Sequence, residues 1–180
     1  MSVGVYRLLI FDRHYSCRLD RSWLTPPSNT DSNQLTPEDT LQLIMGMTYS
    51  LKNMLQKLSP AQPTDADNPS SPNASSSSLT YSAPFPNLQD YSYTYLCSHY
   101  RLLYHESPTG WKFVMLVEPC PASEDLPQIL PSFYANVFLR AVIQNPLYRG
   151  HEKDFGRTGL LAKIDEFITS SSKFKLVQQT

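Results

Sequence analysis

The chain has 180 residues and a formal charge of −1 at pH 7, from 15 Lys and Arg against 16 Asp and Glu. The length suits one domain, and the even charge balance argues against a nucleic-acid-binding protein, which needs a net basic face. With 41% hydrophobic and 12% aromatic residues the chain can bury a core, so it is not disordered throughout.

The cysteines and the length of the first apolar run indicate the cellular compartment. Cys17, Cys97 and Cys120 form no CxxC pair, so we expect them to be reduced, as in the cytosol. The apolar run 8–11 is followed at once by Asp and Arg. We therefore expect neither a signal peptide nor a membrane span.

Segment 59–90 differs in composition from the rest of the chain. Of its 32 residues 14 are Ser or Pro, and none is Lys or Arg. Such a segment cannot bury enough apolar surface to offset its ordering entropy. We therefore predict a single domain over residues 1–180 with a flexible Ser/Pro-rich insertion at 59–90, and a shorter polar loop at 25–35.

Five segments have the pattern of β-strands. Residues 3–11 and 111–117 are apolar at odd and even positions alike, as in strands buried on both faces. Residues 15–23 are mixed and charged, which is typical of an edge strand. Tyrosines alternate with small polar residues from 91 to 98, so this strand is expected to be half-buried and also suited to an edge. Residues 101–106 form the remaining strand, and 107–110 turn the chain back.

Three segments have helical periodicity. In the first, 36–58, Thr36 suits the N-cap, Pro37 the first turn and Asp39 a capping box. The second, 126–145, is apolar over most of its circumference, and the third, from 158, carries a single apolar stripe. The loop 147–157 is polar. The pattern predicts an α/β fold with helices on each face of a sheet.

The first helix has two arcs of different character. Its expected core face is Leu41, Leu43, Ile44, Met47, Thr48, Leu51, Met54, Leu55 and Leu58. Met45 and Tyr49 lie outside this arc among polar residues, and Gly46 on the same side costs roughly 1 kcal/mol of helix propensity relative to Ala. Exposed aromatic, Met and Gly residues are typical of protein-binding surfaces. We predict two such surfaces, the first made of Met45, Gly46, Tyr49, Lys52 and Gln56 and the second of Tyr91, Tyr93 and Tyr95.

No residues in the sequence assemble into an enzyme site. His14 and Cys17 are three apart across a turn and a strand, and we expect them to diverge. Cys97-Ser98-His99 offers at most two metal ligands, and no second cluster completes a tetrahedral set. We predict no catalytic residue, no metal and no cofactor. A small hydrolase that uses Cys17 would need a converged triad, which the sequence does not supply.

Several motifs, in chain order, resemble one family. They are Ile10-Phe-Asp-Arg-His14 with Asp20-Arg-Ser-Trp23, Gly46-Met-Thr-Tyr-Ser50 with Lys57-Leu-Ser-Pro60, Tyr100-Arg-Leu-Leu-Tyr104 with Glu106-Ser-Pro-Thr-Gly110, and Asn145-Pro146-Leu147. Together they resemble the small longin-like subunits of the TRAPP vesicle-tethering complex, the subunit 1 family. The resemblance implies a longin or SNARE-like α/β (α+β) fold, with a five-stranded, mainly antiparallel sheet, one helix on one face and two on the other. The Ser/Pro-rich insertion departs from the family pattern.

The resemblance also implies a function. It predicts a non-catalytic core subunit of a complex that acts as guanine-nucleotide exchange factor for the Rab GTPase of ER-to-Golgi transport. The expected partners are a second longin-like subunit of the synbindin type, a palmitoylated α/β TRAPP subunit and, through the assembled complex, the Rab GTPase. The expected location is cytoplasmic and peripheral on Golgi and endoplasmic reticulum membranes. The alternative within the fold is the small chain of a clathrin-adaptor-like coat complex.

Overall fold

The chain divides into two compact units, and parts of both are described by a computed structural model. The units are Met1–Ser28 with Ser78–Thr180, and Asn29–Ser77. The described residues are 3–23, 36–58, 80–82, 91–119, 126–148, 155, 158–171 and 174–175.

The first unit is built on a sheet whose five longer strands follow the order β2-β1-β6-β5-β4. These strands pair antiparallel, and β5 and β6 form a hairpin closed by the predicted turn at 107–110. The order and pairing confirm the predicted longin-like fold. The strands are β1 (Val3–Phe11), β2 (Cys17–Ser22), β4 (Tyr91–Leu96), β5 (Arg101–Glu106) and β6 (Lys112–Val117).

Two short strands extend the sheet beyond the prediction. β7 (Phe174–Lys175) pairs parallel with the start of β1. β3 (Thr80–Ser82) pairs antiparallel with β4, so the prediction that β4 is an edge strand is wrong. β3 also lies inside segment 59–90, where a loop was expected. The rest of that segment and the whole of the loop at 25–35 lie outside the described residues.

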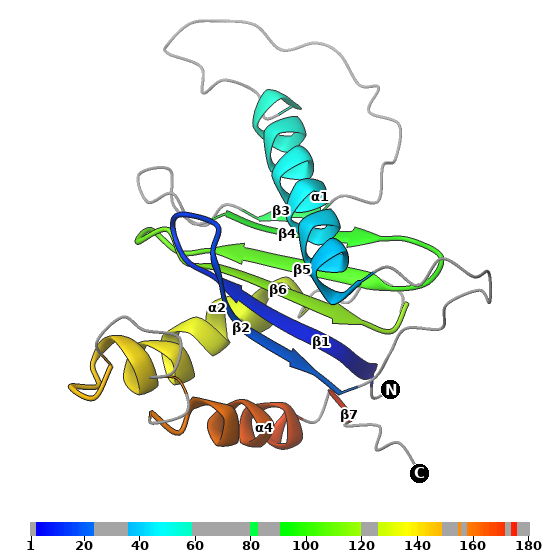
Figure 1. The fold of residues 1–180 in the computed structure, drawn as a ribbon. Coiled ribbons are helices and arrows are strands. Elements are labelled where there is room, and N and C mark those ends of the chain that lie inside the picture. Colours follow the sequence, from blue (N-terminus) through cyan, green and yellow to red (C-terminus); the bar gives the residue numbers. More distant parts are fainter. Residues whose placement is uncertain are drawn as a thin grey trace, which may run out of the picture. The chain divides into compact units, whose positions relative to one another are not determined.

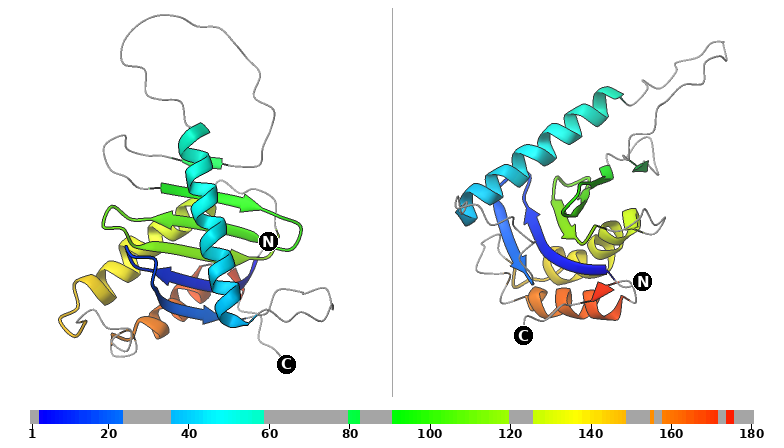
Figure 2. Two further views of the ribbon diagram at one scale, coloured as in Figure 1. Left: turned by 45° about the horizontal axis from the view of Figure 1, so that its top comes forward. Right: turned by 90° about the vertical axis from the view of Figure 1, so that its right-hand side faces the viewer.

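One face of the sheet is covered by the helices that follow it. The segment η1 (Leu126–Gln128), α2 (Ile129–Phe133) and η2 (Tyr134–Ile143) lies across this face beside α4 (Leu160–Ser170) (Figures 1 and 2). Their apolar side chains and those of the strands share one buried cluster. Its fully buried members include Leu8, Ile10, Phe113, Met115, Phe133, Phe138, Val142 and Ile164.

The central strands are buried on both faces, as predicted for 3–11 and 111–117. Leu9 and Val114, which are not members of that cluster, have no exposed surface. Leu102 on β5 is equally buried. Each such side chain contributes roughly 1.5–3 kcal/mol through burial, so these strands hold the unit together.

The predicted helix 126–145 is not uniform. It begins as a 3₁₀ turn, continues for one short α-helical stretch, and becomes π-helical from Tyr134. Pro131 lacks the N–H that an α-helix uses at this position, so a regular α-helical ladder is interrupted there. Pro127 lies in the first turn, where a proline is tolerated. At the end, Gln144 N donates to Leu139 O at 2.8 Å, a five-residue spacing that belongs to the π-helix.

The second unit contains α1 (Pro37–Leu58). Its predicted capping box is confirmed: Asp39 N donates to Thr36 Oγ1 at 3.1 Å, and Thr36 N donates to Asp39 Oδ2 at 3.3 Å. Of the expected core face, Ile44 and Thr48 are buried. Leu43 and Met54, at the margins of the predicted arc, are 58% and 49% exposed, so their assignment to the core is wrong.

Candidate protein-binding surfaces

The predicted surface on α1 is largely open. Tyr49 is 54% exposed, and Gly46 and Gln56 are also exposed. Met45 and Lys52 are half-buried, and the carbonyl of Met45 accepts a hydrogen bond from the Thr48 hydroxyl at 2.9 Å. A Cβ atom added at Gly46 would meet no atom within 4 Å. The helix therefore offers a glycine-centred surface beside an exposed tyrosine.

The apolar part of α1 that reaches solvent is larger than the sequence indicated. Leu43 and Met54 add to Tyr49, and all three are close to half exposed or more. Contiguous exposed apolar patches are typical of a surface that another protein covers, and on this helix Leu43 and Met54 lie on a different side from Tyr49. Angular position alone places Leu43 and Met54 on the core face, so their exposure could not be predicted from the sequence.

The tyrosines of β4 do not form the expected exposed edge. Tyr93 is 2% exposed, and its ring stacks on that of Tyr104 at 4.6 Å between centroids. Burial raises the pKa of its hydroxyl, and the Glu106 carboxylate adds to this effect. Tyr95 is half-buried, and the backbone of Tyr91 pairs with that of Glu106. Tyr93 is thus a core residue, and its prediction as an exposed contact is wrong.

The turn between β1 and β2 is held in place by one carboxylate. Asp12 accepts hydrogen bonds from the backbone N–H groups of His14 and Ser16 at 2.8 and 2.9 Å. Arg18 donates to the same side chain from Nε and a terminal nitrogen, at 2.9 and 2.7 Å. Burial favours a higher pKa, but these four bonds outweigh it and hold the pKa of Asp12 below its usual value. Tyr15, in the same turn, has a φ of 63°, a left-handed backbone conformation that residues other than glycine rarely adopt.

A buried lysine joins this turn to the β5–β6 turn. Lys112 Nζ donates to the carbonyls of Asp12 at 3.4 Å and Gly110 at 3.0 Å. It also lies 4.1 Å from the centre of the Tyr15 ring and 3.8 Å from a carboxylate oxygen of Glu106. Two of the motifs that resemble TRAPP subunits, at 10–14 and 106–110, therefore meet at one end of the sheet, where Lys112 contacts both.

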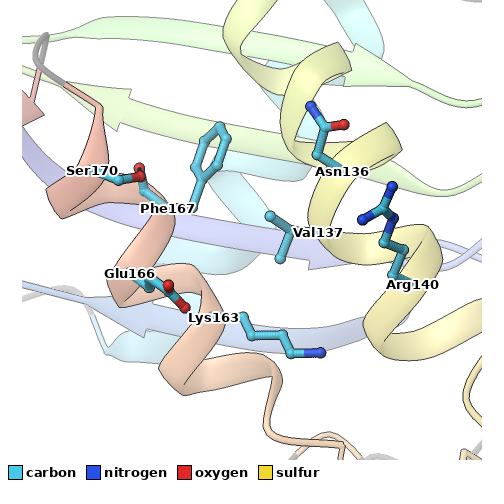
Figure 3. Close-up of a pocket in the computed structure, with 7 residues that line it drawn as sticks. All are labelled: Asn136, Val137, Arg140, Lys163, Glu166, Phe167 and Ser170. Carbon is cyan, nitrogen blue, oxygen red and sulfur yellow. Dashed lines mark hydrogen bonds between the residues drawn. The ribbon is translucent and has the colours of Figure 1, made fainter.

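A groove between η2 and α4 was not predicted from the sequence. It has a volume of about 330 Å³ and is a shallow hollow that is widely open to solvent. Val137 points from η2 toward α4, and Phe167 lies opposite, while charged and polar side chains stand around them (Figure 3). The lining residues are Asn136, Val137, Arg140, Lys163, Glu166, Phe167 and Ser170.

The residues weighed for catalysis have structural partners. Cys17 Sγ contacts Leu19 O at 3.5 Å, and His14 Nε2 accepts from Arg13 Nε at 3.0 Å. Cys97 Sγ donates to Tyr100 O at 3.2 Å. Cys120 lies outside the described residues.

His105 is a titratable residue that lies in the core, although no pattern in the sequence places it there. It is 2% exposed, its Nδ1 lies 2.9 Å from Ser92 Oγ, and its ring packs near those of Phe113 and Tyr134. Desolvation lowers the pKa of His105 to about 4, although the Glu106 carboxylate acts in the opposite direction. The imidazole is therefore neutral at physiological pH, which suits a packing role.

The described part of the chain has neither a cluster of metal-ligating side chains nor a helix suited to a membrane. No group of three or more His, Cys, Asp and Glu side chains is arranged to hold a metal ion. No helix in the same ranges has the length and apolar character needed to cross a bilayer.

Comparison with known proteins identifies the family. The sequence model of the Sybindin-like family matches residues 5–153. The chain is 25% identical to transport protein particle subunit bet5 of Schizosaccharomyces pombe over 94% of its own length and 99% of that protein. It is 24% identical to trafficking protein particle complex subunit 1 of Dictyostelium discoideum, over 91% of this chain and 89% of the relative. The chain is also 23% identical to human trafficking protein particle complex subunit 1, over 79% of this chain and 77% of the relative.

The family match includes every strand of the five-stranded core and both turns joined by Lys112. The relatives are named as subunits of a vesicle-trafficking complex, and their alignments extend over most of both chains. The shared features are thus a whole longin-like domain and not an isolated motif. This chain therefore belongs to the Sybindin-like family.

Proposed function

We propose that the protein is a non-catalytic core subunit of a TRAPP complex and helps to build the platform that exchanges nucleotide on the Rab GTPase of ER-to-Golgi transport. The observation that carries this proposal is the match to a TRAPP subunit over 94% of this chain and 99% of the relative. These relatives favour a TRAPP subunit over the small chain of a clathrin-adaptor-like coat. The partners proposed are a synbindin-type longin subunit and a palmitoylated α/β subunit, with action at the cytoplasmic face of Golgi and endoplasmic reticulum membranes.

The surface on α1 is the proposed contact for the second longin subunit or the GTPase. Tyr49 supplies an exposed aromatic anchor, and the empty space above Gly46 lets another backbone or helix approach closely. Lys52 and Gln56 would form its polar rim, with Met45 beside Gly46. An aromatic anchor inside a polar rim is the arrangement in which a few residues carry most of the binding energy.

A double variant tests this surface. Gly46→Lys fills the open space and Tyr49→Ala removes the anchor, so association should weaken by at least ~2 kcal/mol, the size expected for hot-spot residues. The matched control is Ser132→Lys with Leu161→Ala, which changes exposed residues on α2 and α4 in the same way. Isothermal titration calorimetry with a purified synbindin-type subunit, and circular dichroism as the folding check, measure the effect. Equal affinity of the folded double variant and the control would remove α1 from the interface.

A second measurement tests the role in exchange. The isolated chain should not accelerate release of a fluorescent guanine nucleotide from the Rab, whereas the assembled complex should. Acceleration by the chain alone would contradict the non-catalytic assignment. Failure of the tagged chain to co-purify with any TRAPP subunit would contradict membership of the complex.

A further inference from the structure

The groove between η2 and α4 has an apolar floor. Val137 and Phe167 are both half-buried and face the space between the helices (Figure 3). The ring of Phe133 lies 5.4 Å from that of Phe167 in an edge-to-face arrangement, which fixes its position. The volume of about 330 Å³ is at the lower end of the range of ligand pockets, roughly 300–1,000 Å³. Such a floor suits one or two apolar side chains.

The rim of the groove carries charged side chains that form no ion pair within the described part of the chain. Arg140 on η2 and Lys163 on α4 are exposed, and neither makes an ion pair with any residue that the structure describes. Glu166, three residues after Lys163, is also exposed and makes no such pair. The groove is therefore lined by two positively charged side chains and one negatively charged one, so its net charge is positive. The whole chain, by contrast, has a formal charge of −1.

This combination limits what the groove can bind. Two cations are too few for a nucleic acid, which needs a continuous basic face. Hydrated inorganic anions would use Arg140 and Lys163 but leave the apolar floor bare. A peptide with carboxylates beside an apolar residue uses both, because guanidinium groups bind carboxylates with good geometry and the floor receives the apolar side chain.

We propose that the η2–α4 groove binds an acidic peptide segment of a partner protein. Carboxylates of the segment pair with Arg140 and Lys163, and an apolar side chain rests on Val137 and Phe167. This surface is separate in sequence from the one on α1 and would let the subunit hold a second protein. That the natural partner is another TRAPP subunit rests on the proposed function.

The first experiment uses the full chain and a defined probe. A fluorescein-labelled peptide with glutamates on both sides of a Leu-Phe pair is titrated by anisotropy, beside the same peptide with lysines in place of the glutamates. The acidic peptide should bind at least tenfold more tightly, and Arg140→Glu should abolish that preference. Arg13→Glu, an equal charge change at the exposed β1–β2 turn, is the control and should change affinity less than twofold. Equal binding of the two peptides, or an unaffected Arg140→Glu variant, would overturn the proposal.

The second experiment identifies the natural occupant. The photoreactive amino acid p-benzoylphenylalanine replaces Asn136 in the groove, or exposed Ser132 as control, in chain co-expressed with TRAPP subunits. Irradiation should link position 136 to an acidic segment of another subunit, and Arg140→Glu should reduce the link at least tenfold. A link to a second copy of this chain, or none above the control in an assembled complex, would refute the occupant. If no complex assembles, the proposed function fails, and the peptide titration still decides whether the groove binds acidic segments.

Discussion

Acid should destabilise this protein through one buried histidine. His105 lies in the core with its Nδ1 near the Ser92 hydroxyl, and among the described residues its Nε2 has no hydrogen-bond partner. Protonation would place a charge between the rings of Phe113 and Tyr134 without a second acceptor for its new N–H. The perturbation is therefore a drop in pH, compared in the wild type and in His105→Asn, which retains a polar group near Ser92 but cannot titrate.

The pKa of His105 determines the size and sign of the effect. It is about 4 in the folded chain and 6.5 for an unperturbed histidine, so between these values the unfolded chain binds a proton that the folded chain does not. The free energy of unfolding is unaffected above pH 6.5 and falls as pH decreases toward 4. Between pH 7.5 and pH 5 the loss amounts to about 2 kcal/mol, and it approaches about 3 kcal/mol at lower pH.

Urea unfolding followed by circular dichroism at pH 7.5, 6 and 5 measures this loss. The variant sacrifices ring packing and should be less stable than wild type at pH 7.5. Its free energy of unfolding should, however, fall about 2 kcal/mol less than that of the wild type between pH 7.5 and pH 5, since all other titrating groups are shared. Equal falls in the two proteins would refute the argument that His105 is buried in its neutral form.

Three further predictions concern the turns and the insertion. Asp12→Asn should lower the free energy of unfolding by about 2 kcal/mol, because it removes the carboxylate oxygen that accepts both hydrogen bonds from Arg18. Chemical denaturation measures the loss, and a value below about 0.5 kcal/mol would contradict this reasoning. Gly110→Ala should cost about 1–2 kcal/mol, because φ is 85° and the added Cβ would lie 2.9 Å from Arg13 Cβ, whereas Gly46→Ala on open helix should not destabilise; thermal melts of both variants test the contrast. Deleting residues 62–78 should change the free energy of unfolding by less than about 0.5 kcal/mol, because the Ser/Pro-rich composition of this segment predicts a flexible insertion. Loss of folding would contradict that prediction.

Local signals in the sequence predicted local structure well. The bounds 3–11 and 101–106 agree with β1 and β5, because continuous apolar runs between polar turns leave little freedom in where a strand begins and ends. The capping box at Thr36 is confirmed for the same reason, since its two partners are only three residues apart. These features need no knowledge of the rest of the fold.

Features that depend on distant partners could not be predicted. Tyr93 alternates with polar residues as an exposed residue would, yet β3 and Tyr104 lie beside it and bury it. Phe155 was assigned to a polar loop but is 3% exposed, with its ring near those of Trp111 and Tyr148. A single apolar residue among polar ones has no periodicity, so no pattern identifies it as core.

The two candidate surfaces also differ in whether they depend on one element or on two. The α1 surface was inferred from helical geometry alone, and Tyr49 and Gly46 are exposed as expected. The groove needs residues from η2 and α4, which lie more than twenty positions apart and meet only when both helices pack on the sheet. Sequence spacing within one helix contains no information about such a meeting.

The pairings of β1 have a consequence for how the chain folds. This strand pairs locally with β2, but its other neighbours, β6 and β7, come from the middle and the far end of the described sequence. The β1–β2 and β5–β6 hairpins can form early because their loops are short, whereas closing β1 onto β6 must overcome the entropy of a loop of about a hundred residues. The contact of Val3 with Phe174 depends on the longest closure of all. Folding should therefore be slow for a protein of this size, and β7 should be the last strand to join the sheet.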